Sequence, residues 1–235
     1  NTRRTYMFAL RSYFDFLVER AIIKANPAKA VMLPKRVDPP PGNLSEEDIA
    51  KLMTEAFENK TETGMRDLAI ISVLAGTACR VSAIANMRLN DFRTMDILVP
   101  ERCQHCGQHL ITGRCAGRGK KVRTTMVTLH EKGGKEWNVP LPEKASFYLS
   151  QYLSHRRKCF GTDIVFPTKW RRAIKPISRH TVRDLLGKYA AKAGVVADVN
   201  PHMFRHAAIT WWLDCGVDPE TVQRMVGHKA LQQTL

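Results

Sequence analysis

The sequence predicts an α+β protein that is mainly helical and carries one small antiparallel sheet. Two kinds of pattern support this. Apolar side chains recur at helical spacing along several stretches, and between residues 122 and 141 they alternate on either side of Gly133-Gly134, as the strands of a hairpin do. The chain has 235 residues, which is long enough for one large domain or two modest ones with a real core.

The chain opens with a predicted helix over residues 5–24. Its apolar positions lie at helical spacing with charged residues between them: Tyr6, Leu10, Tyr13, Phe14, Leu17 and Ala21. Asn26-Pro27 ends this helix, and a short helical piece runs from Pro27 to Leu33. One and a half helices cannot bury a core by themselves, so these residues, 1–36, form only part of a domain.

A linker follows, because three consecutive prolines favour an extended and semi-rigid chain over residues 37–44. Ser45 then caps a helix whose first turn is acidic, which suits the helix dipole. We therefore expect a second domain over residues 45–235.

An apolar helix, buried on most sides, is predicted over residues 64–78, with its pattern broken at Gly76. Arg80 begins the next helix directly after it. An arginine in that position is poorly solvated and needs a partner, and a phosphate would serve as a bidentate one.

The middle of the chain predicts the sheet. Met95–Pro100 forms one strand, and the hairpin around Gly133-Gly134 presents Lys132 and Lys135 at its turn. Lysines at a hairpin tip are usually only solvated. A helix over residues 143–158, a turn-like piece at 163–167, the basic segment KWRRAIK and a helix from Ser178 to Lys192 complete this region.

The stretch from Asn200 to His228 organises the rest. Pro201 opens a helix on which His202 and Arg205 share one face, and Gly216 ends it. Asp218-Pro219 starts another helix, which stops at Gly227-His228. A histidine and an arginine three residues apart usually form a simple surface pair, so the motif alone carries little weight.

Charge narrows the classes of partner. The net charge is +15 and the pI about 9.8, which favours a polyanionic partner, nucleic acid before membrane. No apolar run approaches the ~20 residues of a membrane span. The chain opens without a signal peptide and without Met, and its six cysteines are typical of a reduced intracellular protein. We expect a cytoplasmic, nucleoid-associated location.

The order of Arg80, Lys132 in a hairpin, His202-x-x-Arg205 and Gly227-His228 resembles the tyrosine recombinases of the phage integrase family. The resemblance covers nearly the whole chain apart from one insert. It implies a tyrosine-recombinase catalytic domain after the end of a helical core-binding domain. It also implies cleavage and rejoining of duplex DNA through a 3′-phosphotyrosine, in a synaptic tetramer and without a catalytic cofactor.

The resemblance implies a role for each motif residue. Arg80 and Arg205 hold the nonbridging phosphate oxygens, His202 assists as general base, His228 hydrogen-bonds the phosphate, and Lys132, rather than Lys135, is the general acid. Basic side chains outside this set are candidate DNA contacts, although a solvated basic face is equally consistent with them: Arg3, Arg4, Arg11, Lys135, His180 and Arg183.

The insert, at about 101–121, makes the connection roughly twenty residues longer than is usual in the family. Cys103-x-x-Cys106-Gly has the form of a zinc knuckle, and Cys115 supplies a third thiolate. We expect a structural zinc with His109 as fourth ligand; three free thiols in a basic loop are the alternative, and the other candidate fourth ligands are His105 and His130.

One departure from the family pattern leaves a second hypothesis open, a DNA-binding relative that does not cleave. Ala83 stands where the family usually has a carboxylate, so Asp91 supplies one from elsewhere or the site is weakened. The nucleophilic tyrosine is expected just beyond Leu235. The tyrosines of the chain sit at core-like helical spacings and are poor substitutes: Tyr6, Tyr13, Tyr148, Tyr152 and Tyr189.

Overall fold

The computed structural model describes residues 2–33, 44–99, 120–131, 134–156 and 161–227. The chain divides into two compact units, Asn1–Pro41 and Gly42–Leu235. Among the described residues, no helix is both long enough and apolar enough to cross a membrane.

The first unit is one helix with a short return. Helix α1 (Thr2–Glu19) ends earlier than predicted, because the chain leaves it through a left-handed backbone at Ala21, φ 55°. The 3₁₀ turn η1 (Pro27–Lys29) is held to α1 by the Arg11 guanidinium, which donates to the carbonyls of Ala28 (3.1 Å) and Val31 (2.7 Å).

The apolar positions of α1 are largely exposed, in contrast to the core-like placement that their spacing suggests. Tyr6 is 67% exposed and Tyr13 is 57% exposed. One helix and one turn leave an amphipathic face without a second layer to cover it. The first unit therefore does not build a core of its own from the described residues, as the sequence predicts.

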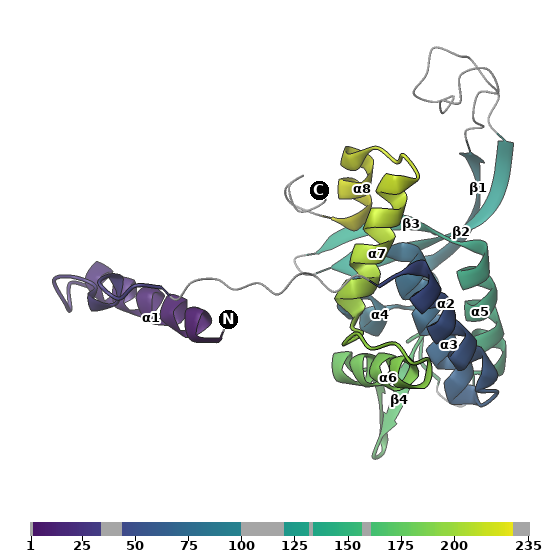
Figure 1. Ribbon diagram of the computed structural model, residues 1–235, viewed down its shortest axis with the longest axis horizontal. Coiled ribbons are helices and arrows are strands. Elements are labelled where there is room, and N and C mark those ends of the chain that lie inside the picture. The colour runs from purple at the N-terminus through teal and green to yellow at the C-terminus, as the bar shows by residue number, and fades with distance from the viewer. Residues whose placement is uncertain (1, 34–43, 100–119, 132–133, 157–160, 228–235) are drawn as a thin grey trace, which may run out of the picture. The chain divides into compact units, whose positions relative to one another are not determined.

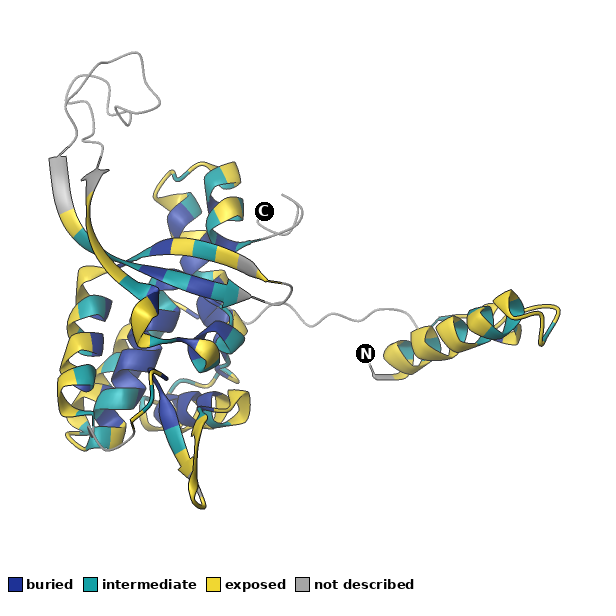
Figure 2. Ribbon diagram, turned by 180° about the vertical axis from the view of Figure 1, so that it is seen from behind, coloured by how far each residue is buried: buried dark blue, intermediate teal, exposed yellow. Residues whose placement is uncertain are grey.

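In the second unit, helix α3 (Glu62–Thr77) lies at the centre, and Figure 2 shows it buried along most of its length. It packs against its neighbours on several sides, among them α2 (Glu46–Glu58), α5 (Glu143–His155) and α7 (Pro201–Asp214). Helices α4 (Val81–Asn86), α6 (Arg179–Lys192) and α8 (Pro219–Val226) complete the helical part (Figure 1).

Most helix starts follow from local capping chemistry. Ser45 forms a capping box with Asp48 at α2, and Asp218 caps α8 by accepting from the Thr221 N–H, with Pro219 in the first turn, as the sequence predicts. Asn200 and Ser178 cap α7 and α6 in the same way.

The sheet is a three-stranded antiparallel one in the order β1-β2-β3. Strand β1 (Phe92–Val99) begins before the predicted start at Met95, and β2 (Lys120–Glu131) and β3 (Lys135–Leu141) form the predicted hairpin. Val127 lies opposite Val139 and Leu129 opposite Trp137, and these pairs face the core side. The predicted zinc insert connects β1 to β2 and lies outside the described residues, apart from the start of β2.

A second hairpin was not predicted. The segment expected to be turn-like and basic forms β4 (Pro167–Trp170) and β5 (Ala173–Pro176), paired from Pro167↔Pro176 to Trp170↔Ala173. It lies next to α6 (Figure 1). Its strands lack the alternation of apolar and polar residues that marks a half-buried strand, because β5 is exposed over most of its length.

Gly76 does not interrupt α3, which continues through it to Thr77. Gly76 instead allows α3 and the residue before α5 to approach each other closely. A Cβ built on Gly76 would lie 2.7 Å from Cγ of Pro142, at the start of α5. The glycine allows α3 and the β3–α5 corner to touch, so the break in apolar pattern marks a contact between helices.

We expect Gly76→Ala to lower the free energy of unfolding by about 1–3 kcal/mol, the usual cost of overpacking. Gly187→Ala is the matched control, because Gly187 lies on the exposed face of helix α6 with nothing within 4 Å of its Cβ position. The control should be neutral or raise stability by ~0.5–1 kcal/mol. Denaturant unfolding of both variants measures this, and equal stabilities would contradict the close approach.

Candidate active site

The corner between α3 and α4 places the first arginine. Ala78, the residue that ends α3, has a left-handed backbone with φ 51° and ψ 21°, which is uncommon for a residue with a side chain. This turn carries the chain through the buried Cys79 to Arg80, which stands as N-cap of α4 and is partly buried. Arg80 is therefore held at a helix start beside the core.

Arg205 is the most deeply placed cation of the site. Its residue is 5% exposed, and its guanidinium donates from Nη1 to the Ala78 carbonyl at 2.8 Å and from Nη2 to the Val226 carbonyl. Both acceptors are neutral main-chain groups. The two bonds orient the guanidinium while leaving its positive charge without neutralisation by these partners.

The charges of the site act on one another. Burial, and next the positive charge of Arg80, lower the pKa of Arg205 to about 10, against a small opposing effect of Cys79. The pKa of His202 is lowered as well, first by desolvation and then by the charges of Arg205, His206 and Arg80. Arg80, His202 and Arg205 therefore lie close enough for their charges to act on one another.

A second contact joins α8 to the sheet. Gly227 ends α8 with a left-handed backbone, φ 67°, and a Cβ built there would lie 2.7 Å from the indole of Trp137 on β3. The Trp137 indole nitrogen is buried without a hydrogen-bond partner in the structure as described. Trp137 thus packs directly beneath the residue that precedes His228 in the sequence.

This arrangement suits an anion with several oxygens. Two arginines that share one locality stabilise negative charge, and an imidazole with a lowered pKa stays neutral near pH 7 and can accept a proton.

Comparison with known proteins agrees with this geometry. Residues 42–235 match the family model described as the phage integrase family. The chain belongs to the phage integrase family.

Relatives of this family member extend over most of its length. It is 30% identical over 231 residues to tyrosine recombinase XerC of Oceanobacillus iheyensis, covering 96% of this chain and 65% of the relative. It is 28% identical over 231 residues to tyrosine recombinase XerD of Shewanella oneidensis, covering 96% of this chain and 66% of that protein. The chain thus spans a little under two thirds of the length of these curated relatives.

Solved structures share the fold of this phage integrase family member. The XerA recombinase superposes with a TM-score of 0.61 at 22% identity, covering 98% of this chain and 69% of that one. The Tn1549 transposon integrase in complex with circular intermediate DNA gives 0.64 at 15% identity, covering 98% and 72%.

Several predicted site residues lie outside the residues that the structure describes. Lys132 and His228 lie outside the described residues, although each directly follows a described one, Glu131 and Gly227. The side chain of Lys135 is not described either. The same holds for the predicted zinc ligands: Cys103, Cys106, Cys115 and His109. Within the described ranges, no group of three or more His, Cys, Asp or Glu residues could hold a metal ion.

The candidate DNA contacts differ in how far they are engaged within the chain. Arg3 is exposed, and Arg4 lies over the Phe8 ring at 5.6 Å. The guanidinium of Arg11 donates hydrogen bonds to backbone carbonyls of the first unit. On α6 both His180 and Arg183 are exposed, with Arg183 paired to Asp198 at 3.3 Å.

Two of the tyrosines, Tyr152 and Tyr189, are buried in the core. Burial is the main cause that raises the pKa of Tyr152 to about 12, and Tyr189 is fully buried with its hydroxyl 3.3 Å from Oδ2 of Asp67. Side chains held in this way are not available to attack a substrate, which agrees with their core-like spacing.

Asp91 does not supply the carboxylate missing at Ala83, which is itself buried. One Asp91 oxygen accepts from the Arg88 N–H at 2.7 Å, and the other lies 2.9 Å from Nε2 of His130. The second nitrogen of His130 faces Glu136 at 3.2 Å. Because both ring nitrogens of His130 face carboxylates, His130 is not a candidate zinc ligand in this structure. The sequence did not predict this cluster because Asp91 lies far from His130 in sequence.

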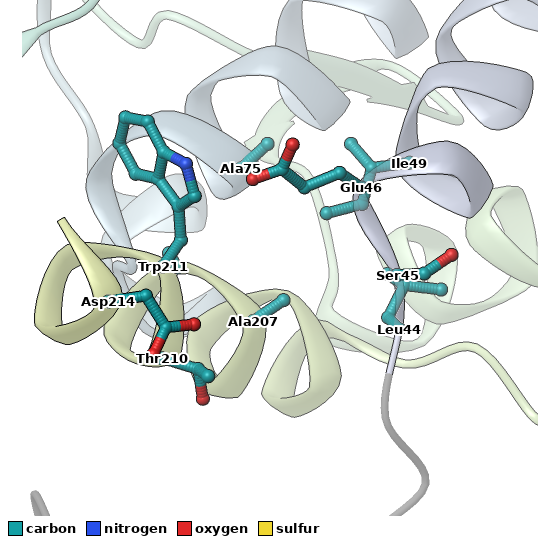
Figure 3. A pocket seen from close by; sticks show the side chains of 10 residues that line it. Leu44, Ser45, Glu46, Ile49, Ala75, Ala207, Thr210, Trp211 and Asp214 are labelled. Atoms are coloured by element: carbon teal, nitrogen blue, oxygen red, sulfur yellow. The ribbon is translucent and has the colours of Figure 1, made fainter.

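A groove of about 450 Å³ lies elsewhere, between the start of α2, α3 and α7 (Figure 3). Trp211 and the carboxylates of Glu46 and Asp214 border it, while Ala207 lies at its floor. It contains none of the three cations named above. Helix α7 therefore serves two separate surfaces, and the candidate active site is the one that holds Arg205.

We expect Gly227→Ala to destabilise the fold by more than Gly216→Ala. Both glycines have positive φ, 67° and 79°, so alanine pays the left-handed backbone cost of ~1–2 kcal/mol at each. Only Gly227 has a ring in the path of its Cβ. Thermal unfolding of the two variants isolates the contact with Trp137, and an equal loss of stability would show that the contact is not made.

Proposed function

We propose that this chain is the catalytic part of a tyrosine-type site-specific recombinase, which cleaves and rejoins duplex DNA through a 3′-phosphotyrosine. The observation that supports this most is the buried Arg205, oriented by backbone carbonyls and coupled to Arg80 and His202. Family membership and the XerC and XerD relatives point to the same chemistry.

In this proposal a tyrosine hydroxyl attacks the phosphorus, the bond from phosphorus to the 5′-oxygen breaks, and a proton is delivered to that oxygen. Arg80 and Arg205 hold the nonbridging oxygens, and His202, neutral because its pKa is lowered, accepts the tyrosine proton. Lys132 delivers the proton to the 5′-oxygen, and His228 hydrogen-bonds the phosphate. No cofactor takes part.

The nucleophile in this proposal is a tyrosine beyond Leu235, since Tyr152 and Tyr189 are engaged in the core. The partners are double-stranded DNA and further copies of the recombinase in a synaptic tetramer. Solved neighbours described as bound to DNA, such as XerH with a difH substrate, support the first of these. We propose in addition that residues 1–36 are the end of a core-binding domain, joined to the catalytic domain by the linker at 37–44.

The proposal predicts that Arg205→Lys nearly abolishes cleavage while leaving DNA binding within a few-fold. Lysine keeps a positive charge but loses the fork that bonds two carbonyls and the phosphate together. We expect a fall of about a hundredfold or more, the usual effect of removing one charge-stabilising donor. Covalent adduct on a labelled nicked substrate measures this, with the full-length protein.

Arg224→Lys is the matched control, because Arg224 lies on the neighbouring helix α8 and its Nε bonds only to a backbone carbonyl of its own helix among the contacts described. The control should cleave like the unchanged protein. If Arg205→Lys cleaves equally well, Arg205 is not part of the chemistry. If the unchanged full-length protein gives no adduct on its own site, the recombinase proposal itself is wrong.

We also propose a structural zinc in the insert, held by Cys103, Cys106, Cys115 and His109. The donor set supports it: three thiolates and one imidazole match the tetrahedral preference of zinc, and a short loop without a core gains order from such a site.

Elemental analysis should find about one zinc per chain in protein purified without added metal. Replacing Cys103 and Cys106 together by Ser should remove it, whereas Cys215→Ser should not, because Cys215 is an exposed free thiol on another helix end. Zinc below about a tenth of an equivalent, with the thiols reduced, would overturn the site.

A further inference from the structure

The hairpin that leads to Lys132 extends beyond the sheet that supports it. Strand β1 starts to pair with β2 at Phe92↔Val127, whereas β2 and β3 remain paired from Thr128↔Asn138 to Glu131↔Lys135. These last pairs form a two-stranded ribbon, and such a ribbon is only marginally stable alone. Its direction must therefore be set by contacts with the rest of the protein.

One face of this ribbon is apolar and packed. Leu129 and Trp137 lie opposite each other, so their side chains share a face. Leu129 is buried, and the Trp137 ring touches Gly227. This contact fixes the ribbon from the side of α8.

The other face is polar and is held by His130, which lies opposite Glu136. His130 Nε2 is 2.9 Å from Oδ1 of Asp91, and its Nδ1 is 3.2 Å from Oε1 of Glu136. Asp91 is 8% exposed and is anchored in turn by the Arg88 N–H. Of these bonds, the one to Asp91 leaves the ribbon and reaches the turn that precedes β1.

The bond between Asp91 and His130 joins two segments that carry residues of the proposed active site. Asp91 lies in the 3₁₀ turn η2 (Leu89–Asp91), which follows α4, and Arg80 is the N-cap of α4. His130 precedes Lys132 by two residues. A bond between Asp91 and His130 thus joins the segment that carries Arg80 to the hairpin that carries Lys132.

We propose that His130, held by Asp91, is a positioning residue that fixes the hairpin so that Lys132 reaches the leaving 5′-oxygen. This rests on the proposed function, in which Lys132 is the general acid. His130 itself touches no reacting atom. Its charged form is the one that donates to both carboxylates, and these hydrogen bonds raise its pKa, Asp91 first.

The test separates proton delivery from every other step by changing the leaving group. One nicked substrate carries the natural 5′-oxygen at the scissile phosphate, and the other carries a bridging sulfur in its place. A thiolate leaves without being protonated, because a thiol is far more acidic than an alcohol. A defect in Lys132 or in its placement should therefore slow the oxygen substrate and spare the sulfur substrate.

We expect His130→Phe in the full-length protein to slow cleavage of the oxygen substrate by about tenfold or more, part of the ~10²–10⁴ that a general acid contributes. Cleavage of the sulfur substrate and affinity for the site should remain within about twofold. Asp91→Asn should give the same pattern, since its remaining oxygen can still accept from Arg88. His155→Phe is the matched control, as an exposed histidine at the end of α5, and should change neither rate.

The pH dependence of cleavage by the unchanged protein gives a second measurement. The raised pKa means that His130 is protonated below it and loses a donor and its charge as the pH rises through it. In the described structure, Asp91 on η2 and Glu136 on β3 are the charged groups that face the ring. The cleavage rate of the oxygen substrate, divided by that of the sulfur substrate, should therefore fall as the pH rises through the pKa of His130, which lies above its usual value of about 6.5. In His130→Phe this pH dependence of the ratio should be absent.

The outcomes distinguish this inference from the function on which it rests. Lys132→Ala should lose oxygen cleavage and keep sulfur cleavage; if it loses both, Lys132 is not the general acid and the positioning role fails with it. If Lys132→Ala behaves as expected but His130→Phe slows both substrates equally, or neither, the recombinase stands and the positioning role of His130 is wrong.

Discussion

One buried cation holds this fold together at the point where the chemistry is expected. Taking a guanidinium out of water costs several kcal/mol, so its hydrogen bonds must be good. Arg205 meets this demand with carbonyls from two helix ends, Ala78 at the end of α3 and Val226 at the end of α8. Helix ends leave carbonyls without partners and carry partial negative charge. The arginine and the helix ends therefore satisfy each other, and α3, α7 and α8 are fixed together.

The same arrangement gathers positive charge in one place. Arg80 lies near enough to lower the pKa of Arg205, and both lower that of His202, so the folded chain holds positive groups together at some expense of stability. Bringing a phosphate to this place relieves the repulsion. This gathering of positive charge fits a site that binds a developing negative charge more tightly than a neutral group.

Local chemistry in the sequence was enough to predict much of this. Ser45 and Asp218 predict the starts of two helices, and the glycines after Lys132 predict the hairpin. Each of these residues determines the backbone only of the residues next to it. What escaped prediction is long-range or unpatterned. One acceptor of Arg205 is a backbone carbonyl 127 residues away, and Asp91 lies 39 residues before His130. The β4–β5 hairpin has no apolar alternation, and the break in the apolar pattern at Gly76 could not be assigned to a contact because Pro142 lies far from it in sequence.

The absence of a carboxylate at Ala83 is easier to understand in this light. A side-chain partner for an arginine is lost when that one residue changes, but a backbone carbonyl is present whatever residue carries it. Arg205 depends on the backbone of Ala78 and Val226, so the identity of those residues matters only through the left-handed turn and the packing they must allow. A site oriented by main-chain acceptors can lose an acidic neighbour and keep its geometry. The carboxylate Asp91 is then free to hold the hairpin, where no main-chain group performs that task among the contacts described.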